Sequence, residues 1–242
     1  MQKTILTSAT YRQASEATPE MVQKDPENRL LAHGARYRLP AETLRDQALS
    51  MAGLLVEKLG GPSVKPYQPE GLWTDLTQQG QYVQEHGENL YRRSLYTFWK
   101  RTIPPPSMAN FDAPSRESCT VQRGFTNSPL QALDLMNDVS YLEAARVLAE
   151  RMMKEGGATA EQRIAFAFRL ATGRLPSAGE SRVLAESLHY SLVKFQTRPN
   201  SAIKYLKVGE HPRDQKIDAQ ELAAYTTIAS LIINLDETVT KE

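Results

Sequence analysis

Arginine and aromatic side chains gather in one stretch of this sequence, residues 91–123, which reads YRRSLYTFWKRTIPPPSMANFDAPSRESCTVQR. Guanidinium groups bind carboxylates through paired, charge-assisted hydrogen bonds. The stretch therefore predicts a pocket for an anion or an acidic sugar. Its candidate binding residues are Arg93, Tyr96, Trp99, Arg101, Asp112 and Arg116.

The same arginines have a structural alternative. Along the first half of the chain they alternate with Asp25, Asp46 and Asp112, and one buried guanidinium can satisfy several backbone carbonyls and a carboxylate together. The chain has 29 Lys and Arg against 28 Asp and Glu, so no surplus of unpaired arginines is visible. This balance favours buried Arg–Asp networks that tie loops to helices.

An enzyme is the alternative function. A hydrolase or lyase acting on an acidic polysaccharide would hold its substrate with Arg93 and Arg101 and move protons with Tyr96 or Asp112. Cys119 is the only cysteine and has no nearby histidine in sequence to serve as a base. Because a lone cysteine is typical of inert packing, we expect Cys119 to be buried. The missing catalytic constellations favour a protein without catalysis.

Cofactor motifs are not visible in the sequence. The four histidines, His33, His86, His189 and His211, lack the spacings of a metal site. CxxCH and the glycine-rich phosphate loops are also missing. We therefore expect neither a metal nor a cofactor in this chain. A weaker alternative is noncovalent contact with haem through His33, His86 or His189.

The composition is typical of a soluble globular protein, with 40% hydrophobic and 24% charged residues. A formal net charge of +1 gives no field to attract nucleic acid, so we expect no nucleic-acid partner. The longest apolar run, residues 227–235, is shorter than the roughly twenty residues of a membrane span. The N-terminus has no apolar core of signal-peptide length. We expect no membrane span and no targeting signal in this chain.

The elements that must position these residues are predicted to be mostly helices. In the second half of the chain, apolar residues recur at helical spacing, and a break between two helices is indicated at Asn137-Asp138. Residues 204–216 are polar and predict an exposed, mobile connection. Capping boxes open at Ser128, Thr159, Ser177 and Asp218.

The first half is predicted to combine helices with proline-rich loops. Helix starts are indicated at Asp25-Pro26 and Leu39-Pro40, with Gly60 ending the second helix. Residues 60–123 predict ordered loop with short elements. Leu95 to Trp99 fit a strand or a helix, and as a strand they could pair with residues 116–123.

The fold class that follows is mainly α: a helical array with a proline-rich ordered loop region and room for a minor β-hairpin. We expect residues 1–125 to form the N-terminal helices and a proline-rich crossing, and residues 126–242 to form the C-terminal helical array. Together they are expected to make a single family domain.

Several motifs, in order along the chain, resemble the planctomycete domain-of-unknown-function family 1553. They include TSATYRQAS (residues 7–15), DPENRLL (25–31), RLPAETLRDQAL (38–49), GGPSV (60–64), the arginine-rich stretch described above, TNSPLQALDLMND (126–138) and IINLDETVTKE (232–242). The resemblance extends from residue 7 to the C-terminus. Val139 stands where the family commonly has proline, which bears on the predicted helix break.

The resemblance implies a setting for the chain. Members of that family are typically the C-terminal part of large proteins whose upstream regions are similar to haem-binding cytochrome c domains, sometimes with a sugar-binding sandwich domain between. It therefore implies a fragment of a larger periplasmic or cell-surface protein, with haem c only in the upstream domains. We expect a non-catalytic binding or scaffolding module whose partners are neighbouring haem or sugar-binding domains, or a polysaccharide.

Overall fold

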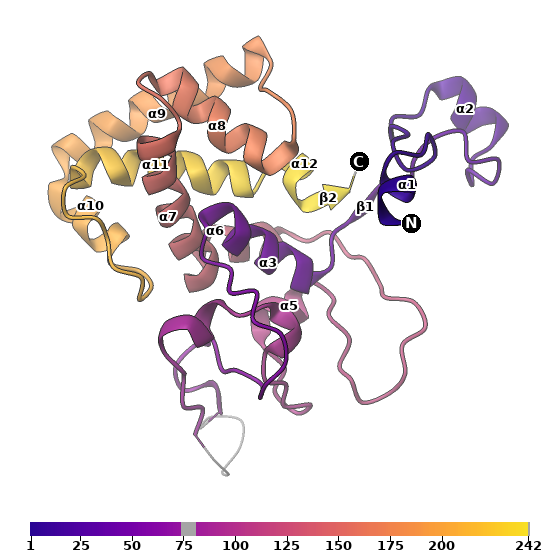
Figure 1. Cartoon of the computed structure of the whole chain (residues 1–242), viewed down its shortest axis with the longest axis horizontal. Coiled ribbons are helices and arrows are strands. Elements are labelled where there is room, and N and C mark those ends of the chain that lie inside the picture. The colour runs from indigo at the N-terminus through magenta and orange to yellow at the C-terminus, as the bar shows by residue number, and fades with distance from the viewer. Residues whose placement is uncertain (74–80, 242) are drawn as a thin grey trace.

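The computed structural model describes residues 1–73 and 81–241. The described part is mainly α, as predicted, and its helices pack in an array beside a loop-rich region (Figure 1). Residues 74–80 belong to the predicted proline-rich region and lie outside the described residues. The α-helices are α1 (Gln2–Leu6), α2 (Pro19–Lys24), α3 (Ala41–Ala52), α5 (Pro106–Asn110), α6 (Pro129–Asn137), α7 (Val139–Glu155), α8 (Ala160–Thr172), α9 (Ala178–Thr197), α10 (Pro199–Leu206), α11 (Ala219–Ile233) and α12 (Asp236–Val239).

Helix α11 forms the centre of the array and packs against α7, α8, α9 and α10. Its sequence is apolar on nearly every side, which is the pattern of a helix surrounded by protein. Leu222, Ile228 and Ile232 are fully buried. Helix α7 lies between α11 and α3, so one core joins the two halves of the chain. Within the described ranges, no helix combines the length and apolarity of a transmembrane span.

Local capping signals set the helix starts in the second half. Ser128, Thr159 and Ser177 each form the predicted capping box, and the Asp218 carboxylate accepts hydrogen bonds from the backbone N–H groups of Gln220 and Glu221. The break at Asn137-Asp138 is confirmed: α6 ends at Asn137, and Asp138 caps α7 by accepting from the Ser140 N–H at 2.8 Å.

Two predicted helix boundaries in the first half are wrong. No helix starts at Asp25, because α2 ends at the residue before it. The Asp25 carboxylate instead accepts hydrogen bonds from the backbone N–H groups of Arg29 and Leu30, and these bonds close a turn. Helix α3 starts after Pro40 as predicted but ends at Gly53, well before Gly60. Gly53 adopts φ of 77°, a left-handed conformation that stops a helix and that favours glycine.

The segment from 87 to 99 is neither of the predicted alternatives. It forms two short 3₁₀ turns, η1 (Gly87–Tyr91) and η2 (Ser94–Tyr96), and then an isolated parallel bridge between Thr97 and Val64. The predicted pairing with residues 116–123 does not occur, because Val64 takes the place beside this segment through hydrogen bonds with Tyr96 and Phe98. Local sequence could not reveal a partner so distant along the chain.

Buried arginines hold these loops, as the structural alternative predicts, although within the described ranges Arg92 donates to backbone carbonyls and pairs with no aspartate. Arg92 is 3% exposed, and its guanidinium donates to the carbonyls of Pro62, Lys58 and Gly60 at 3.1, 3.0 and 2.6 Å. Arg45 on α3 donates to the Arg92 carbonyl at 3.0 Å. The Arg92 guanidinium thus supplies hydrogen bonds to the loop of residues 58–62, whose carbonyls have no regular backbone ladder to accept from.

A small antiparallel sheet of two two-residue strands joins the segment before α3 to the C-terminal segment. Strand β1 (Tyr37–Arg38) pairs with β2 (Thr240–Lys241), with Tyr37 opposite Lys241 and Arg38 opposite Thr240. The Leu39 N–H extends the pairing to the Val239 carbonyl at 2.8 Å. In Figure 1, α1 and α2 project from this point, away from the helical array and beside the C-terminus.

The connection predicted to be exposed and mobile is anchored instead. Its first residues complete α10, and the loop that follows packs on Glu143 of α7, which is 1% exposed. The Glu143 carboxylate accepts from the His211 N–H at 2.6 Å and from the Tyr91 hydroxyl at 3.1 Å. A side chain at Gly209 would place its Cβ 2.3 Å from Glu143, so the loop approaches too closely for any other residue.

Candidate functional site

The exposed face of α3 carries a row of polar side chains. Its buried face holds Ala41, Leu44, Ala48 and other residues against α7, so helical periodicity turns Glu42, Thr43, Asp46, Gln47 and Ser50 outward. Glu42 and Asp46 lie one turn apart on this outward side. Helix α3 therefore presents two carboxylates to the loops that cross in front of it.

Those loops and α3 enclose an open hollow of about 400 Å³. Three arginines enter it from separate loop positions, together with the two carboxylates of α3. The hollow is lined by Pro40, Glu42, Thr43, Asp46, Arg93, Leu95, Arg116 and Arg123. It therefore concentrates charged side chains at one open surface.

A second hollow of about 500 Å³ continues from the first along α3. The two share Thr43, Asp46 and Arg93 in their linings, so we describe them together as the α3 trough. The second hollow is lined by Thr43, Asp46, Gln47, Ser50, Leu55, Glu57, Leu59 and Arg93. One end of the trough is thus rich in arginine, and the other offers amide, hydroxyl and carboxylate groups.

The three arginines of the trough differ in how far they are neutralised. Arg123 donates to both Glu42 carboxylate oxygens, at 2.7 and 3.1 Å. Arg93 is half exposed, and its Nε lies 3.6 Å from an Asp46 oxygen. Among the described residues, Arg116 joins no ion pair; its guanidinium lies over the Trp99 ring, 4.5 Å from the ring centre. Arg116 is therefore the most available cation of the trough.

The carboxylates are already engaged. Burial acts to raise the pKa of Glu42, but the Arg123 hydrogen bonds, with backbone hydrogen bonding and the charges of Arg123 and Arg116, outweigh it, and the pKa of Glu42 is lowered. One Asp46 oxygen accepts from the Ser94 N–H at 2.7 Å. Hydrogen bonds thus fix both carboxylates, and Glu42 is ionised at neutral pH.

The structure brings together some of the predicted site residues and separates others. Arg93 and Arg116 share the arginine-rich hollow, and Trp99 supports Arg116 while its indole N–H donates to the Ser115 carbonyl at 3.1 Å. Arg101 is exposed in a turn. Tyr96 instead lies under the Arg92 guanidinium, with 3.9 Å to its ring centre, and its hydroxyl accepts from the Gly60 N–H.

Asp112 has a different position and a full set of partners. Its carboxylate pairs with Arg38 and accepts from the Thr126 N–H at 2.8 Å and from the Thr126 hydroxyl at 2.9 Å. Its backbone is left-handed, with φ of 58°, a conformation that Asp tolerates better than most residues. Asp112 therefore ties the segment after α5 to the strand before α3.

Sequence reasoning did not place Glu42, Asp46 and Arg123 in the candidate site. Of these three, the sequence suggested only Asp46, as a member of a structural network, while Arg123 appeared merely as the last residue of the arginine-rich stretch. The one usable signal was the spacing of Glu42 and Asp46, which puts both on one side of a helix. Nothing in the sequence places Arg123 beside Glu42, because an irregular loop brings it there.

Other reactive side chains lie outside the trough lining. Cys119 is exposed, so its predicted burial is wrong: it lies in the irregular segment between Asp112 and α6, which packs little of its length against the core. His86 contacts Glu210 at 2.9 Å, while His189 is exposed on α9. Within residues 1–73 and 81–241, no group of His, Cys, Asp and Glu has a metal-binding arrangement.

Comparison with known proteins identifies the family. No curated protein and no solved structure matches the chain. The model of the family PSD1, described as a protein of unknown function (DUF1553), matches residues 1–188, which include α3, both loops of the trough and the helices up to the middle of α9. This match confirms the resemblance seen in the sequence motifs, and the chain belongs to the PSD1 family.

Proposed function

We propose that the chain is a non-catalytic binding module that holds an acidic polysaccharide along the α3 trough. Arg116 carries the proposal. Its guanidinium lies over the Trp99 ring at the edge of an open hollow and makes no ion pair among the described residues. A positioned guanidinium with free N–H groups binds carboxylate or sulfate groups through charge-assisted hydrogen bonds.

The shape of the trough supports a polymer rather than a small anion. Its two hollows, about 400 and 500 Å³, are continuous through Thr43, Asp46 and Arg93. An acidic sugar unit would lie against Arg93 and Arg116. The next unit would then meet the side chains of Gln47 and Ser50, which can exchange hydrogen bonds with sugar hydroxyl groups.

The hydrogen bonds and charge state of the carboxylates favour a binding function over the hydrolase or lyase alternative. That alternative requires Asp112 or Tyr96 to exchange protons with a substrate, but both accept structural hydrogen bonds away from the trough. In the trough, Glu42 has a lowered pKa and two Arg123 contacts. A carboxylate so stabilised in its charged form is a poor proton donor near neutral pH.

The proposed setting rests on family membership. We place the module in a larger periplasmic or cell-surface protein, beside haem-binding or sugar-binding domains of the same polypeptide. In that setting the trough would hold a polysaccharide near the redox centre of another domain. Binding of the chain to separately produced neighbouring domains would test this part of the proposal.

The polysaccharide proposal is tested by calorimetric titration of the chain with oligogalacturonate, and with a neutral dextran oligomer as the uncharged comparison. We expect binding of the acidic oligomer only. The Arg93→Gln and Arg116→Gln variants should each bind about tenfold more weakly, since a hydrogen bond to a charged group contributes about 1.5–3 kcal/mol. Rising salt should weaken binding further.

The matched control is Arg182→Gln, which removes an exposed arginine on α9 that is not part of the trough lining. It should leave the affinity unchanged. Equal weakening by all three substitutions would show attraction to positive charge in general and would refute a site at α3. Release of shortened or unsaturated sugar products during the titration would instead favour the enzyme alternative.

A further inference from the structure

The sequence from residue 187 to residue 209 contains no acidic residue. This range covers the second half of α9, all of α10 and the turn between them. It contains four cations, namely Lys194, Arg198, Lys204 and Lys207. Since the whole chain has a formal net charge of only +1, positive charge is concentrated here and the remainder of the chain is net negative.

These four cations are exposed, and within the described ranges none of them joins an ion pair. Lys194 lies near the Phe195 ring, 5.6 Å from its centre, a contact that leaves the charge of the ammonium group unneutralised. The nearest acidic residues along the chain are Glu186 and Glu210, and Glu210 already contacts His86 at 2.9 Å. The four cations are therefore available to an anionic partner.

Exposed apolar side chains lie among the cations of α9. Leu188 and Phe195 are buried, so helical periodicity turns Tyr190, Val193 and Lys194 to the outward side. Tyr190 is 71% exposed and Val193 is 47% exposed. The outward side of α9 thus presents a cation beside an aromatic and an aliphatic side chain.

Helix α10 repeats this combination. Ala202 and Leu206 are buried, whereas Ile203 is 47% exposed and is followed by the exposed Lys204. In Figure 1, α10 and the end of α9 lie together at the edge of the array opposite the two termini. We call this surface the basic edge; it consists of Tyr190, Val193, Lys194, Arg198, Ile203, Lys204 and Lys207.

The mixture of side chains at the basic edge fits the surface of an anionic membrane. Lys and Arg are attracted to anionic headgroups, Tyr lies at headgroup level, and aliphatic side chains reach the acyl boundary. An acidic polysaccharide would use the cations but would leave Tyr190 and Ile203 in water. The small net charge of the chain does not oppose the contact, because the potential of a membrane acts over about 8 Å at physiological salt.

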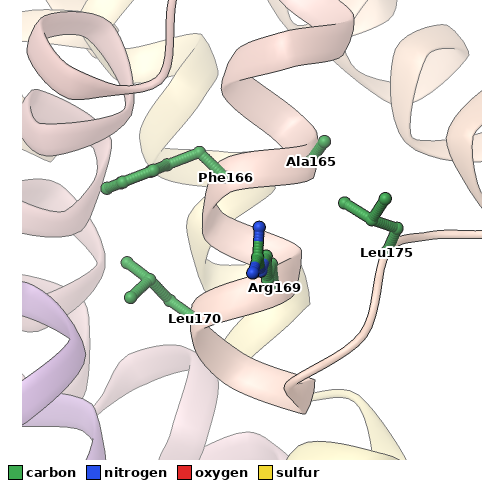
Figure 2. A pocket seen from close by; sticks show the side chains of 5 residues that line it. All are labelled: Ala165, Phe166, Arg169, Leu170 and Leu175. Atoms are coloured by element: carbon green, nitrogen blue, oxygen red, sulfur yellow. The ribbon is translucent and has the colours of Figure 1, made fainter.

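A hollow at α8 shows a weaker form of the same combination. It measures about 430 Å³ and is lined by Ala165, Phe166, Arg169, Leu170 and Leu175 (Figure 2). Arg169 joins no ion pair in the described part of the chain, but it is the single cation of this lining. One cation adds only about fivefold to the affinity for an anionic membrane. The α8 hollow is therefore a suitable comparison for the basic edge.

We propose that the basic edge binds the surface of a membrane that contains anionic lipid, so that the chain lies on the membrane without crossing it. The four cations contact lipid phosphate groups, and Tyr190, Val193 and Ile203 are covered by the headgroup region. The net negative remainder of the chain orients the basic edge toward the membrane. This inference is independent of the polysaccharide proposal, because the basic edge shares no residue with the α3 trough.

The test is sedimentation of the full chain with vesicles made from equal parts of phosphatidylglycerol and phosphatidylcholine, or from phosphatidylcholine alone. We expect binding to the anionic vesicles only. Lys204→Gln with Lys207→Gln should weaken it about 25-fold, since each cation contributes about fivefold. The matched control, Lys3→Gln with Arg12→Gln, removes the same charge from exposed residues near the N-terminus and should bind like the native chain. Equal weakening by both pairs would overturn the proposal.

The apolar side chains distinguish a membrane from a soluble polyanion. Ile203→Gln keeps every charge and should weaken vesicle binding severalfold, whereas Leu170→Gln at the α8 hollow should leave it unchanged. Circular dichroism melting checks that each variant is folded. Native binding by Ile203→Gln, with release from the vesicles by oligogalacturonate, would show a site for acidic polymers in general and would overturn the membrane proposal.

A native chain that does not sediment with the anionic vesicles would also overturn it. The two proposals fail separately, because the variant with Lys204→Gln and Lys207→Gln should keep the native affinity for oligogalacturonate in the calorimetric titration. Loss of that affinity would show that the acidic oligomer binds at the basic edge, and it would refute both the α3 site and the assignment of this edge to lipid.

Discussion

Neighbouring arginines in this protein have opposite roles. Arg92 is 3% exposed and donates to three loop carbonyls, whereas Arg93 is half exposed and reaches the α3 trough. The difference arises from the extended backbone between the two 3₁₀ turns, which directs successive side chains to opposite sides. Arg116 has a third role, because its guanidinium lies over the Trp99 ring and joins no ion pair within the described ranges.

At the scale of single residues, we predict that Glu42→Gln strengthens the binding of acidic oligomers. The substitution removes a negative charge from the trough and frees Arg123, whose two best acceptors are the Glu42 oxygens. One carboxylate fewer beside three arginines should raise the affinity severalfold at low salt. Calorimetric titration of the variant with oligogalacturonate measures the change.

Asp134→Asn provides the comparison for this prediction. It also removes one carboxylate, but Asp134 lies on α6 beside Asn110 and outside the trough lining. It should leave affinity nearly unchanged. If Glu42→Gln weakened binding, Arg123 would be shown to need Glu42 for its position, and the trough would bind its ligand through a preformed pair instead of a freed cation.

Among the elements, the junction of α6 and α7 shows how one residue ends one helix and starts another. Asp138 has an extended backbone, and its carboxylate accepts from the Ser140 N–H at 2.8 Å. Burial raises its pKa above the ordinary value, against the effects of the Ser140 hydrogen bonds and the Arg45 charge. The Asp138 carboxylate therefore caps α7, although burial disfavours its charged form.

We predict opposite effects for two substitutions of Asp138. Asp138→Ala removes the cap and should lower the free energy of unfolding by about 1 kcal/mol. Asp138→Asn keeps an acceptor and removes the buried charge, so its free energy of unfolding at pH 7 should equal or exceed that of the native chain. Urea unfolding of both variants, followed by circular dichroism, measures the two values.

The pH dependence distinguishes the charge from the cap. Since the folded pKa of Asp138 is raised, the folded chain holds this proton more tightly than the unfolded chain, and the contribution of the group to stability falls as pH rises above about 3.8. The advantage of Asp138→Asn should therefore grow from pH 3.8 upward and then level off. An advantage that does not change with pH would show that burial of the charge has no cost.

At the scale of the whole molecule, the buried core and residues 1–36, the N-terminal arm, are separate parts. The core surrounds α11 and joins α3 to the C-terminal helices, while residues 1–36 bury nothing. The arm is held by β1 and by surface contacts such as the Arg36–Asp236 ion pair and the Lys241 ammonium, 5.3 Å from the Tyr11 ring centre. Exposed contacts of this kind contribute little to stability.

We predict that a chain beginning at Tyr37 folds and that its free energy of unfolding stays within about 1 kcal/mol of the native value, since its buried apolar area is unchanged. Urea unfolding of the shortened and the native chain, followed by circular dichroism, measures this. Extending the deletion through Leu39 removes β1 and a residue packed against the core, and it should cost clearly more. Equal loss in both deletions would show that the arm supports the core.

Most of the helical array was determined by the sequence alone. Ser128, Thr159 and Ser177 formed their predicted capping boxes, and Asp138 separated two helices as expected. Each of these caps depends on residues no more than about four positions apart, because each helical N–H group bonds to a carbonyl one turn earlier in the chain. The family motifs were also visible at this level, and the family match confirmed those within residues 1–188.

Only the tertiary structure decided which charged residues meet. Val64 took the position beside Thr97 that residues 116–123 were expected to occupy, and Asp112 was drawn to Arg38 and Thr126. Arg116 and Arg93, from two different loops, came to line one hollow beside α3. In loops without a repeating hydrogen-bond pattern, each backbone group finds its partner among residues distant in sequence. The exposure of the arm was likewise decided by packing, since nothing local prevents its leucines from being buried.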